Sequence, residues 1–275
     1  MFRPRPHSVL KRDTDTLSPV APSQHAPRSG GLSTTDTPPI GVFDAAGQRW
    51  GVTDAAIGIL LAAACSLGWA WLTRTVVIEE WLQVLGAYLA VWVPLVVVLC
   101  IADVARGRRS FASDFGLRVR WIDLLWGVGI GLLARGLVTL LELAWIGRTS
   151  LDGGVLALPT GFAFWFGVVL APVLLGPIIE ETFYRGLVLR AVVRRTGGRP
   201  LVAASVAVVV SALVFGLAHL AQGAALSPTA AAVTFVGTFA FGLAAGALAA
   251  ATGRLGGAII AHMVFNGLLV LAIVS

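Results

Sequence analysis

Charged residues are scarce in this sequence, and cysteine is almost absent. Only 12% of the 275 residues are charged while 57% are hydrophobic, whereas an ordinary globular domain carries roughly 25% charged residues. This shortage of charge excludes a typical soluble domain and favours a chain that lies in lipid. The two cysteines, Cys65 and Cys100, lie in apolar runs without CxxC or Cys/His spacing. We therefore expect neither a disulfide framework nor a thiolate metal site.

The distribution of positive charge argues against a nucleic-acid partner. The formal net charge is +6, but the arginines lie in short segments between apolar runs rather than along one basic stripe. That is the pattern of membrane-protein loops, whose basic members stay in the cytoplasm. The connections around Arg108, Arg195 and Arg254 are the basic ones. We expect them and the N-terminus in the cytoplasm, and the C-terminus outside the cell membrane.

Residues 1–48 lack any helical or alternating apolar period. They hold seven of the thirteen prolines and many Ser, Thr and Asp residues, a composition typical of a disordered tail. The basic start, MFRPRPHSVLKRDTDT, is not followed by an apolar core, so no secretory signal peptide is expected. The tail is expected to be cytoplasmic, and residues 49–275 to form the membrane domain.

Apolar runs of about 20 residues recur from Thr53 onward. Each can cross a roughly 30 Å hydrocarbon layer at about 1.5 Å per residue, and in lipid such runs satisfy their backbone groups only as helices. The sequence therefore predicts an all-α fold, a polytopic transmembrane helix bundle of about seven spans. The predicted spans are residues 53–73, 82–102, 121–146, 160–193, 202–221, 229–251 and 255–274.

Two adjacent acids stand inside the fourth predicted span. Glu180 and Glu181, in GPIIEETFYRG, diverge by roughly 100° around a helix, so they cannot have the same role. Glu181 and Arg185 form an i, i+4 pair in the favourable orientation. A structural salt bridge between helices is the competing interpretation of this cluster. Glu180 has no second cation in helical register and is free to face another neighbour.

Two histidines lie in later spans, each with a companion one helical turn away. Phe215 precedes His219 in LVFGLAHL, where its ring can pack beside the imidazole. His262 and Asn266, in AHMVFNG, share one face of the last span. A lone His in an apolar helix is more often a core residue, so each motif is weak by itself. The residues expected to converge on one water-accessible cavity are Glu180, His219, His262 and Asn266.

The motifs EETFYR, FGLAH and HMVFN resemble, in content and order, the EExxxR, FxxxH and HxxxN or HxxxD signatures of one family of intramembrane proteases. This is the CAAX-prenyl-protease and bacteriocin-processing family, also called the type II CAAX endopeptidases or Abi family. The resemblance covers a core of about residues 158–275. It implies an endopeptidase that cleaves near the membrane surface, acting on peptides or on prenylated or other membrane-associated proteins.

The resemblance also implies roles for single residues. Glu180 would be the catalytic acid, and His219, His262 and Asn266 would complete the site. The supporting residues would be Glu181, Arg185 and Phe215. Structurally known relatives have eight helices, so a break of the fourth span at Pro172 or Pro177 is an alternative to seven spans.

Peptide hydrolysis needs a polarised water, a base for its proton and donors for the oxyanion. In one scheme Glu180 and His219 hold the water, while His262 and Asn266 donate to the oxyanion. In the other, a divalent metal such as zinc is bound by Glu180, His219 and His262, leaving a fourth position for water. HExxH is absent from the chain, and the sequence leaves the cofactor open.

Two other classes of function compete with the protease. Intramembrane ionisable residues also mark ion pathways, and Arg135 with Glu142 fits a small-solute transporter or proton relay. Against it, the sequence has no internal repeat of the kind that builds transporters. The other alternative is a membrane scaffold or bacteriocin-immunity protein without turnover. We expect Arg135 and Glu142 to lie outside the site and to serve packing.

Overall fold

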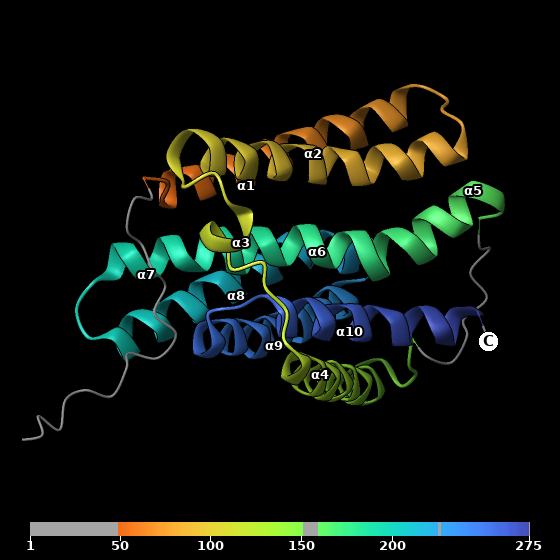
Figure 1. The fold of residues 1–275 in the computed structure, drawn as a ribbon. Helices are drawn as coiled ribbons and strands as arrows, with labels where there is room; N and C mark the ends of the chain where they lie inside the picture. The colour runs from red at the N-terminus through yellow and green to blue at the C-terminus, as the bar shows by residue number, and fades with distance from the viewer. Residues whose placement is uncertain (1–48, 151–158, 225–226, 275) are drawn as a thin grey trace, which may run out of the picture. The chain divides into compact units, whose positions relative to one another are not determined.

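The structure, a computed structural model, describes residues 49–150, 159–224 and 227–274, in which every regular element is a helix (Figure 1). The all-α prediction is confirmed. The predicted tail, residues 1–48, lies outside the described residues. Six helices of the described part are long and apolar enough to span a membrane, and a shorter apolar helix follows, which agrees with about seven spans. Six of these seven are α1 (Val52–Thr75), α2 (Glu80–Arg106), α4 (Trp121–Ile146), α8 (Pro200–Ala224), α9 (Pro228–Thr252) and α10 (Gly256–Val274).

The remaining span is one long composite helix. It runs without interruption over residues 161–196, and the break considered at Pro172 or Pro177 does not occur. Two parts of the helix are π-helical rather than α-helical, so that their N–H groups donate to the carbonyl five residues earlier. Its consecutive parts are α5 (Gly161–Phe164), η1 (Trp165–Leu175), α6 (Gly176–Glu181), η2 (Thr182–Leu189) and α7 (Arg190–Thr196).

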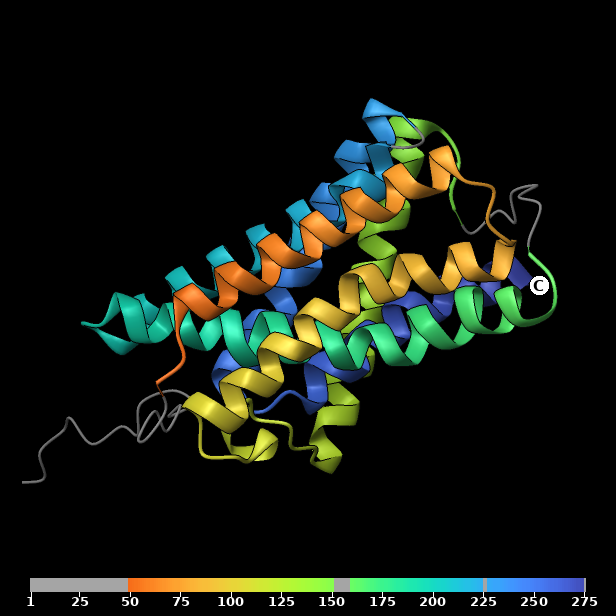
Figure 2. The same ribbon diagram turned by 90° about the horizontal axis from the view of Figure 1, so that it is seen from above.

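The long helix lies between two groups of helices (Figures 1 and 2). On one side α1 packs against α2, and α2 contacts α5, η1, α6 and η2. On the other side α8 packs against α9 and α10 against α4, while α8 contacts η2 and α10 contacts η1 and α6. A short helix, α3 (Phe111–Asp114), follows α2. Side chains from α2, α8 and α10 can therefore all reach the long helix.

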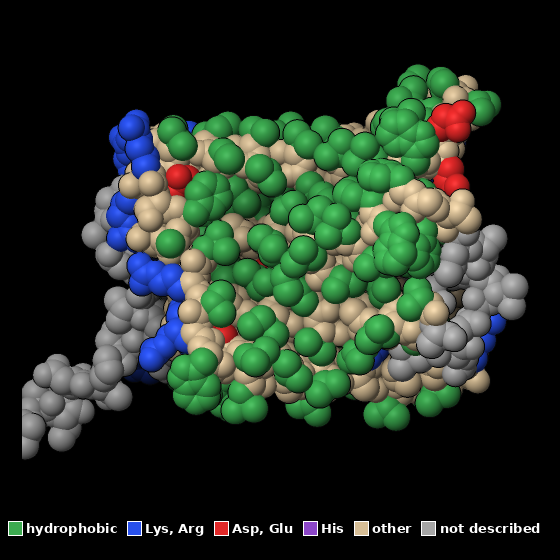
Figure 3. Space-filling model, turned by 45° about the vertical axis from the view of Figure 1, so that its right-hand side comes forward, with side chains coloured by type: hydrophobic (Ala, Val, Ile, Leu, Met, Phe, Trp, Pro, Cys, Tyr) green, Lys and Arg blue, Asp and Glu red, His purple; other side chains and the backbone are tan. Residues whose placement is uncertain are grey.

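Large apolar side chains cover the outer face of the helices (Figure 3). Leu60, Leu133 and Trp165 are among many that are exposed, which suits a hydrocarbon environment. The inner contacts use small residues. At Gly127 and Gly131 of α4 a Cβ would lie 2.7 Å from atoms of α10, so glycine allows the close helix approach that is common in membrane proteins.

Arginine side chains gather at one end of these helices (Figure 3). Arg106 pairs with Asp54 at 2.8 Å, Arg254 with Asp123 at 2.6 Å, and Arg190 donates to the carbonyl of Gly253 at 2.9 Å. The hydrogen bond to Asp123 raises the pKa of Arg254 above its ordinary value. These contacts bring the start of α1 and the predicted basic connections to the same end. Which side of the membrane this end faces stays a prediction.

Candidate active site

The two glutamates at the end of α6 face different helices, as their adjacent positions predict. The Glu180 carboxylate lies 3.7 Å from the Nε2 atom of His219 on α8, and its side chain is 18% exposed. Glu181 is fully buried and faces α10. The same helix thus presents one acid to a cavity and the other to the protein interior.

The buried acid accepts hydrogen bonds from two cationic or potentially cationic groups. Its Oε1 atom lies 2.9 Å from Nη1 of Arg185 and 3.0 Å from Nδ1 of His262. The predicted ion pair between Glu181 and Arg185 is therefore present. Arg185 also donates to the carbonyl of Gly242 on α9 at 3.4 Å. This cluster links the long helix to α9 and α10, and it leaves the buried carboxylate paired.

Phe215 lies between the two acid sites. Its ring centroid is 4.3 Å from that of His219 and 5.7 Å from that of His262. The Arg185 guanidinium lies over its face, 4.5 Å from the centroid. The predicted packing of Phe215 beside His219 is confirmed. The ring therefore separates the His219 imidazole from the His262 imidazole.

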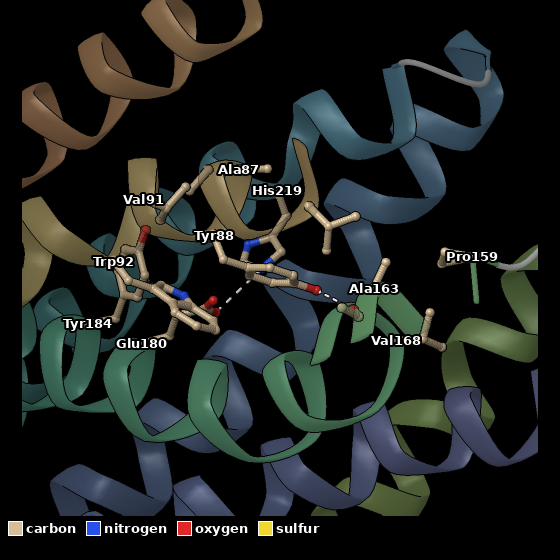
Figure 4. Close-up of a pocket in the computed structure, with 13 residues that line it drawn as sticks. Ala87, Tyr88, Val91, Trp92, Pro159, Ala163, Val168, Glu180, Tyr184 and His219 are labelled. Carbon is tan, nitrogen blue, oxygen red and sulfur yellow. Dashed lines mark hydrogen bonds and ion pairs between the residues drawn. The ribbon is translucent and has the colours of Figure 1, made fainter. Parts of the chain in front are cut away.

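The backbone of α8 determines the tautomer of His219. Its Nδ1 atom lies 2.8 Å from the carbonyl of Phe215, and a carbonyl only accepts, so Nδ1 carries the hydrogen. In the neutral ring Nε2 is then an acceptor, and it faces a second acceptor, the Glu180 carboxylate (Figure 4). The 3.7 Å separation is too long for a direct hydrogen bond. A water that donates to both groups fits this arrangement.

Glu180 and His219 border a cavity of about 450 Å³. Most of its wall is apolar or aromatic and comes from α2, the long helix and α8 (Figure 4). Its aromatic residues, Tyr88, Trp92 and Tyr184, were not predicted from the sequence as site residues. The sequence did offer a signal for the two tyrosines, because they are the only two in the chain and both lie in apolar spans. Both line the cavity. A phenol in an apolar span needs a polar partner or water.

The other two predicted site residues contact the long helix rather than the cavity. The Nδ1 atom of His262 is hydrogen-bonded to the Glu181 carboxylate. The Nδ2 atom of Asn266 donates to the carbonyl of Pro172 at 2.7 Å. Neither is among the residues that line the cavity. The structure thus brings Glu180 to His219, and it joins His262 and Asn266 to the helix that carries the acids.

The ligand set suggested for a metal is divided between the two sites. Glu180 and His219 face each other, whereas Nδ1 of His262 is engaged by Glu181. Among the described residues, no three His, Cys, Asp or Glu side chains come together in a way that could hold a metal ion. Glu180, His219 and His262 do not fit a metal in this arrangement, and we derive no step through one.

Arg135 and Glu142 have partners away from the cavity. Arg135 donates to the carbonyl of Phe265 at 3.2 Å, and its guanidinium lies 4.1 Å from the centroid of that ring. Glu142 accepts from the backbone N–H of Ser150 at 2.9 Å and from its hydroxyl at 3.0 Å. Both residues thus lie outside the site and contact neighbouring parts of the protein, as expected from the sequence.

Comparison with known proteins identifies the part of the chain that carries this site. No curated protein and no solved structure matches the chain. Residues 160–268 match the family described as "Type II CAAX prenyl endopeptidase Rce1-like". That segment holds all three motifs. With the apolar helices, the match indicates a multi-pass membrane protein. For residues 160–268 it confirms the family predicted from the motifs, the type II CAAX endopeptidases.

Proposed function

We propose that the chain is an intramembrane endopeptidase in which Glu180 is the general base for the attacking water. The observation that carries the proposal is the pair of facing acceptors, the Glu180 carboxylate and Nε2 of His219, 3.7 Å apart on two helices. A base must reach its proton within a hydrogen bond or through one water. A water between these groups would meet that condition.

The energetics of the membrane support this assignment. A carboxylate inside an apolar helix costs free energy unless it has a hydrogen-bonded partner or water. Glu181 has such partners in Arg185 and His262. Among the residues that the structure describes, Glu180 has only the distant imidazole as a charged or potentially charged partner, and it borders the cavity. A bound water therefore satisfies Glu180 and is also the reagent that peptide hydrolysis consumes.

The remaining motif residues act, in this proposal, through the helix that bears Glu180. His262 and Arg185 neutralise the buried Glu181, and Asn266 contacts the backbone at Pro172. The donor atoms that make these contacts are Nη1 of Arg185, Nδ1 of His262 and Nδ2 of Asn266. The oxyanion role given to His262 and Asn266 from the sequence stays a prediction.

The cavity wall and the family together suggest the substrate class. Aromatic and aliphatic side chains surround the acid and the imidazole, so an apolar or lipid-modified segment can approach the water. The family match adds prenylated CAAX-type proteins as candidates. We propose a peptide bond in a membrane-associated protein as the substrate.

The test is proteomic comparison of membranes that contain wild-type protein or Glu180→Gln at equal folded yield. Loss of the base should lower turnover by about 10²- to 10⁴-fold, so an uncleaved precursor should accumulate. Glu79→Gln is the matched control, because Glu79 is an exposed loop acid. Normal processing by Glu180→Gln would refute the proposal. A bacteriocin-immunity or uptake phenotype that persists in the variant would favour the scaffold or the transporter.

A further inference from the structure

Two prolines interrupt the backbone hydrogen bonds of the π-helical segment just before the glutamates. Pro172 lies inside η1, and Pro177 stands at the start of α6, five residues later. The N–H of Gly176 donates to the carbonyl of Ala171, five residues earlier. In this register the missing N–H groups of the two prolines would have faced the carbonyls of Gly167 and Pro172.

Each of these two carbonyls receives a donor from another helix. The hydroxyl of Tyr88, on α2, donates to the carbonyl of Gly167 at 2.8 Å. The amide of Asn266, on α10, donates to the carbonyl of Pro172 at 2.7 Å. Proline in a membrane helix is tolerated where neighbouring side chains or π-helical turns satisfy the freed backbone groups. Both features are present here: the segment is π-helical, and one side chain donates to the carbonyl that each proline leaves without an N–H.

The register of this segment decides which acid faces the cavity. A change from a five-residue to a four-residue hydrogen-bond register removes one residue from a turn and rotates the following residues by roughly 100°. Glu180 and Glu181 differ by the same angle. A register change before α6 would therefore move Glu180 away from His219 and alter the contacts of Glu181 with Arg185 and His262.

We propose that Tyr88 and Asn266 are positioning residues, which replace the hydrogen-bond donors that Pro172 and Pro177 lack and so hold Glu180 toward His219. The proposal rests on the proposed function of Glu180. Tyr88 lies outside the segment that matches the family. It also lines the cavity, as His219 does, and its hydroxyl points toward the long helix (Figure 4).

Double-mutant cycles on the unfolding equilibrium test the pairing without any need for activity. Tyr88→Phe should lower the folded-to-unfolded ratio about three- to tenfold, the worth of one hydrogen bond. In a Pro172→Ala background the effect should shrink below about twofold, because alanine restores an N–H for Gly167. The effect of Asn266→Ala on the folded-to-unfolded ratio should shrink in the same way in a Pro177→Ala background. The crossed pairs, Tyr88→Phe with Pro177→Ala and Asn266→Ala with Pro172→Ala, are the matched controls and should be additive.

Peptidase kinetics test the consequence for Glu180. Tyr88→Phe should lower kcat about tenfold with KM within about twofold, because the base is displaced while the cavity wall is kept. The pairing of each side chain with its proline would be overturned if Tyr88→Phe were additive with Pro172→Ala and Asn266→Ala were additive with Pro177→Ala. Coupled cycles with an unchanged kcat would overturn the positioning role and leave a purely structural one. A fully active Glu180→Gln would refute the proposed function, and the stability cycles would still report on the pairing.

Discussion

Single residues in this protein differ most in how completely their charge is compensated. Glu181 and Arg185 are fully buried and paired, and His262 completes the cluster at 3.0 Å. Glu180, one residue earlier, is partly exposed to the cavity and has its nearest imidazole at 3.7 Å. The free energy of unfolding should therefore depend strongly on the first group, and turnover on the second.

Glu181→Gln or Arg185→Ala should reduce the folded yield as well as activity. Each change leaves its partner as an uncompensated buried charge, which costs roughly 3 to 5 kcal/mol. The measurement is the monodisperse fraction after purification, followed by thermal unfolding. Glu180→Gln is the control and should lose activity with a much smaller effect on yield. An unstable Glu180→Gln beside a stable, inactive Glu181→Gln would mean that the two roles are reversed.

At the scale of elements, ion pairs fasten helix ends together at the arginine-rich end. Asp123 is almost fully buried and accepts from Arg254 through both carboxylate oxygens, at 2.6 and 3.2 Å. Its Oδ2 atom also accepts from the backbone N–H of Arg120 at the start of α4. One carboxylate therefore caps α4 and holds the turn between α9 and α10.

Arg254→Ala should lower the free energy of unfolding by about 3 kcal/mol, because it leaves Asp123 buried without its cation. Arg106→Ala is the matched control. The Arg106 side chain is 48% exposed in its pair with Asp54, so its loss should cost about 0.2 to 1 kcal/mol. Unfolding in a denaturing detergent would compare the two variants with wild type. Equal losses would contradict the difference in burial on which this prediction depends.

For the whole molecule, the arginine-rich end should face the cytoplasm. Positively charged connections are retained on that side of a membrane. In a background in which both native cysteines are replaced by alanine, Arg195→Cys should resist an impermeant thiol reagent in intact cells. Arg74→Cys, in the last turn of α1 at the opposite end of the helix from Asp54, should react. Both positions are exposed, and permeabilised cells supply the control for reactivity. Labelling at position 195 in intact cells would reverse the orientation.

Much of the fold and the local contacts of the site could be predicted from the sequence. Lipid imposes helices of a fixed minimum length, so apolar runs predict both the spans and their number. Contacts one turn apart depend only on helix geometry. For that reason Glu181 with Arg185, and Phe215 with His219, follow from spacing alone. The family that residues 160–268 match also follows from the order of the motifs, since each motif is a short local sequence.

Only the tertiary structure decided which helices these residues meet. The contact of His262 with Glu181 spans 81 residues, and that of Tyr88 with Gly167 spans 79. Both depend on the rotation of a helix about its axis, and no local pattern fixes that angle. Pro172 and Pro177 suggested a break from their sequence, but π-helical hydrogen bonding and donors from α2 and α10 keep the helix continuous. The sequence alone determined that two acids diverge, and packing decided which of them faces the cavity, because side-chain direction depends on the hydrogen-bond register of the preceding turn.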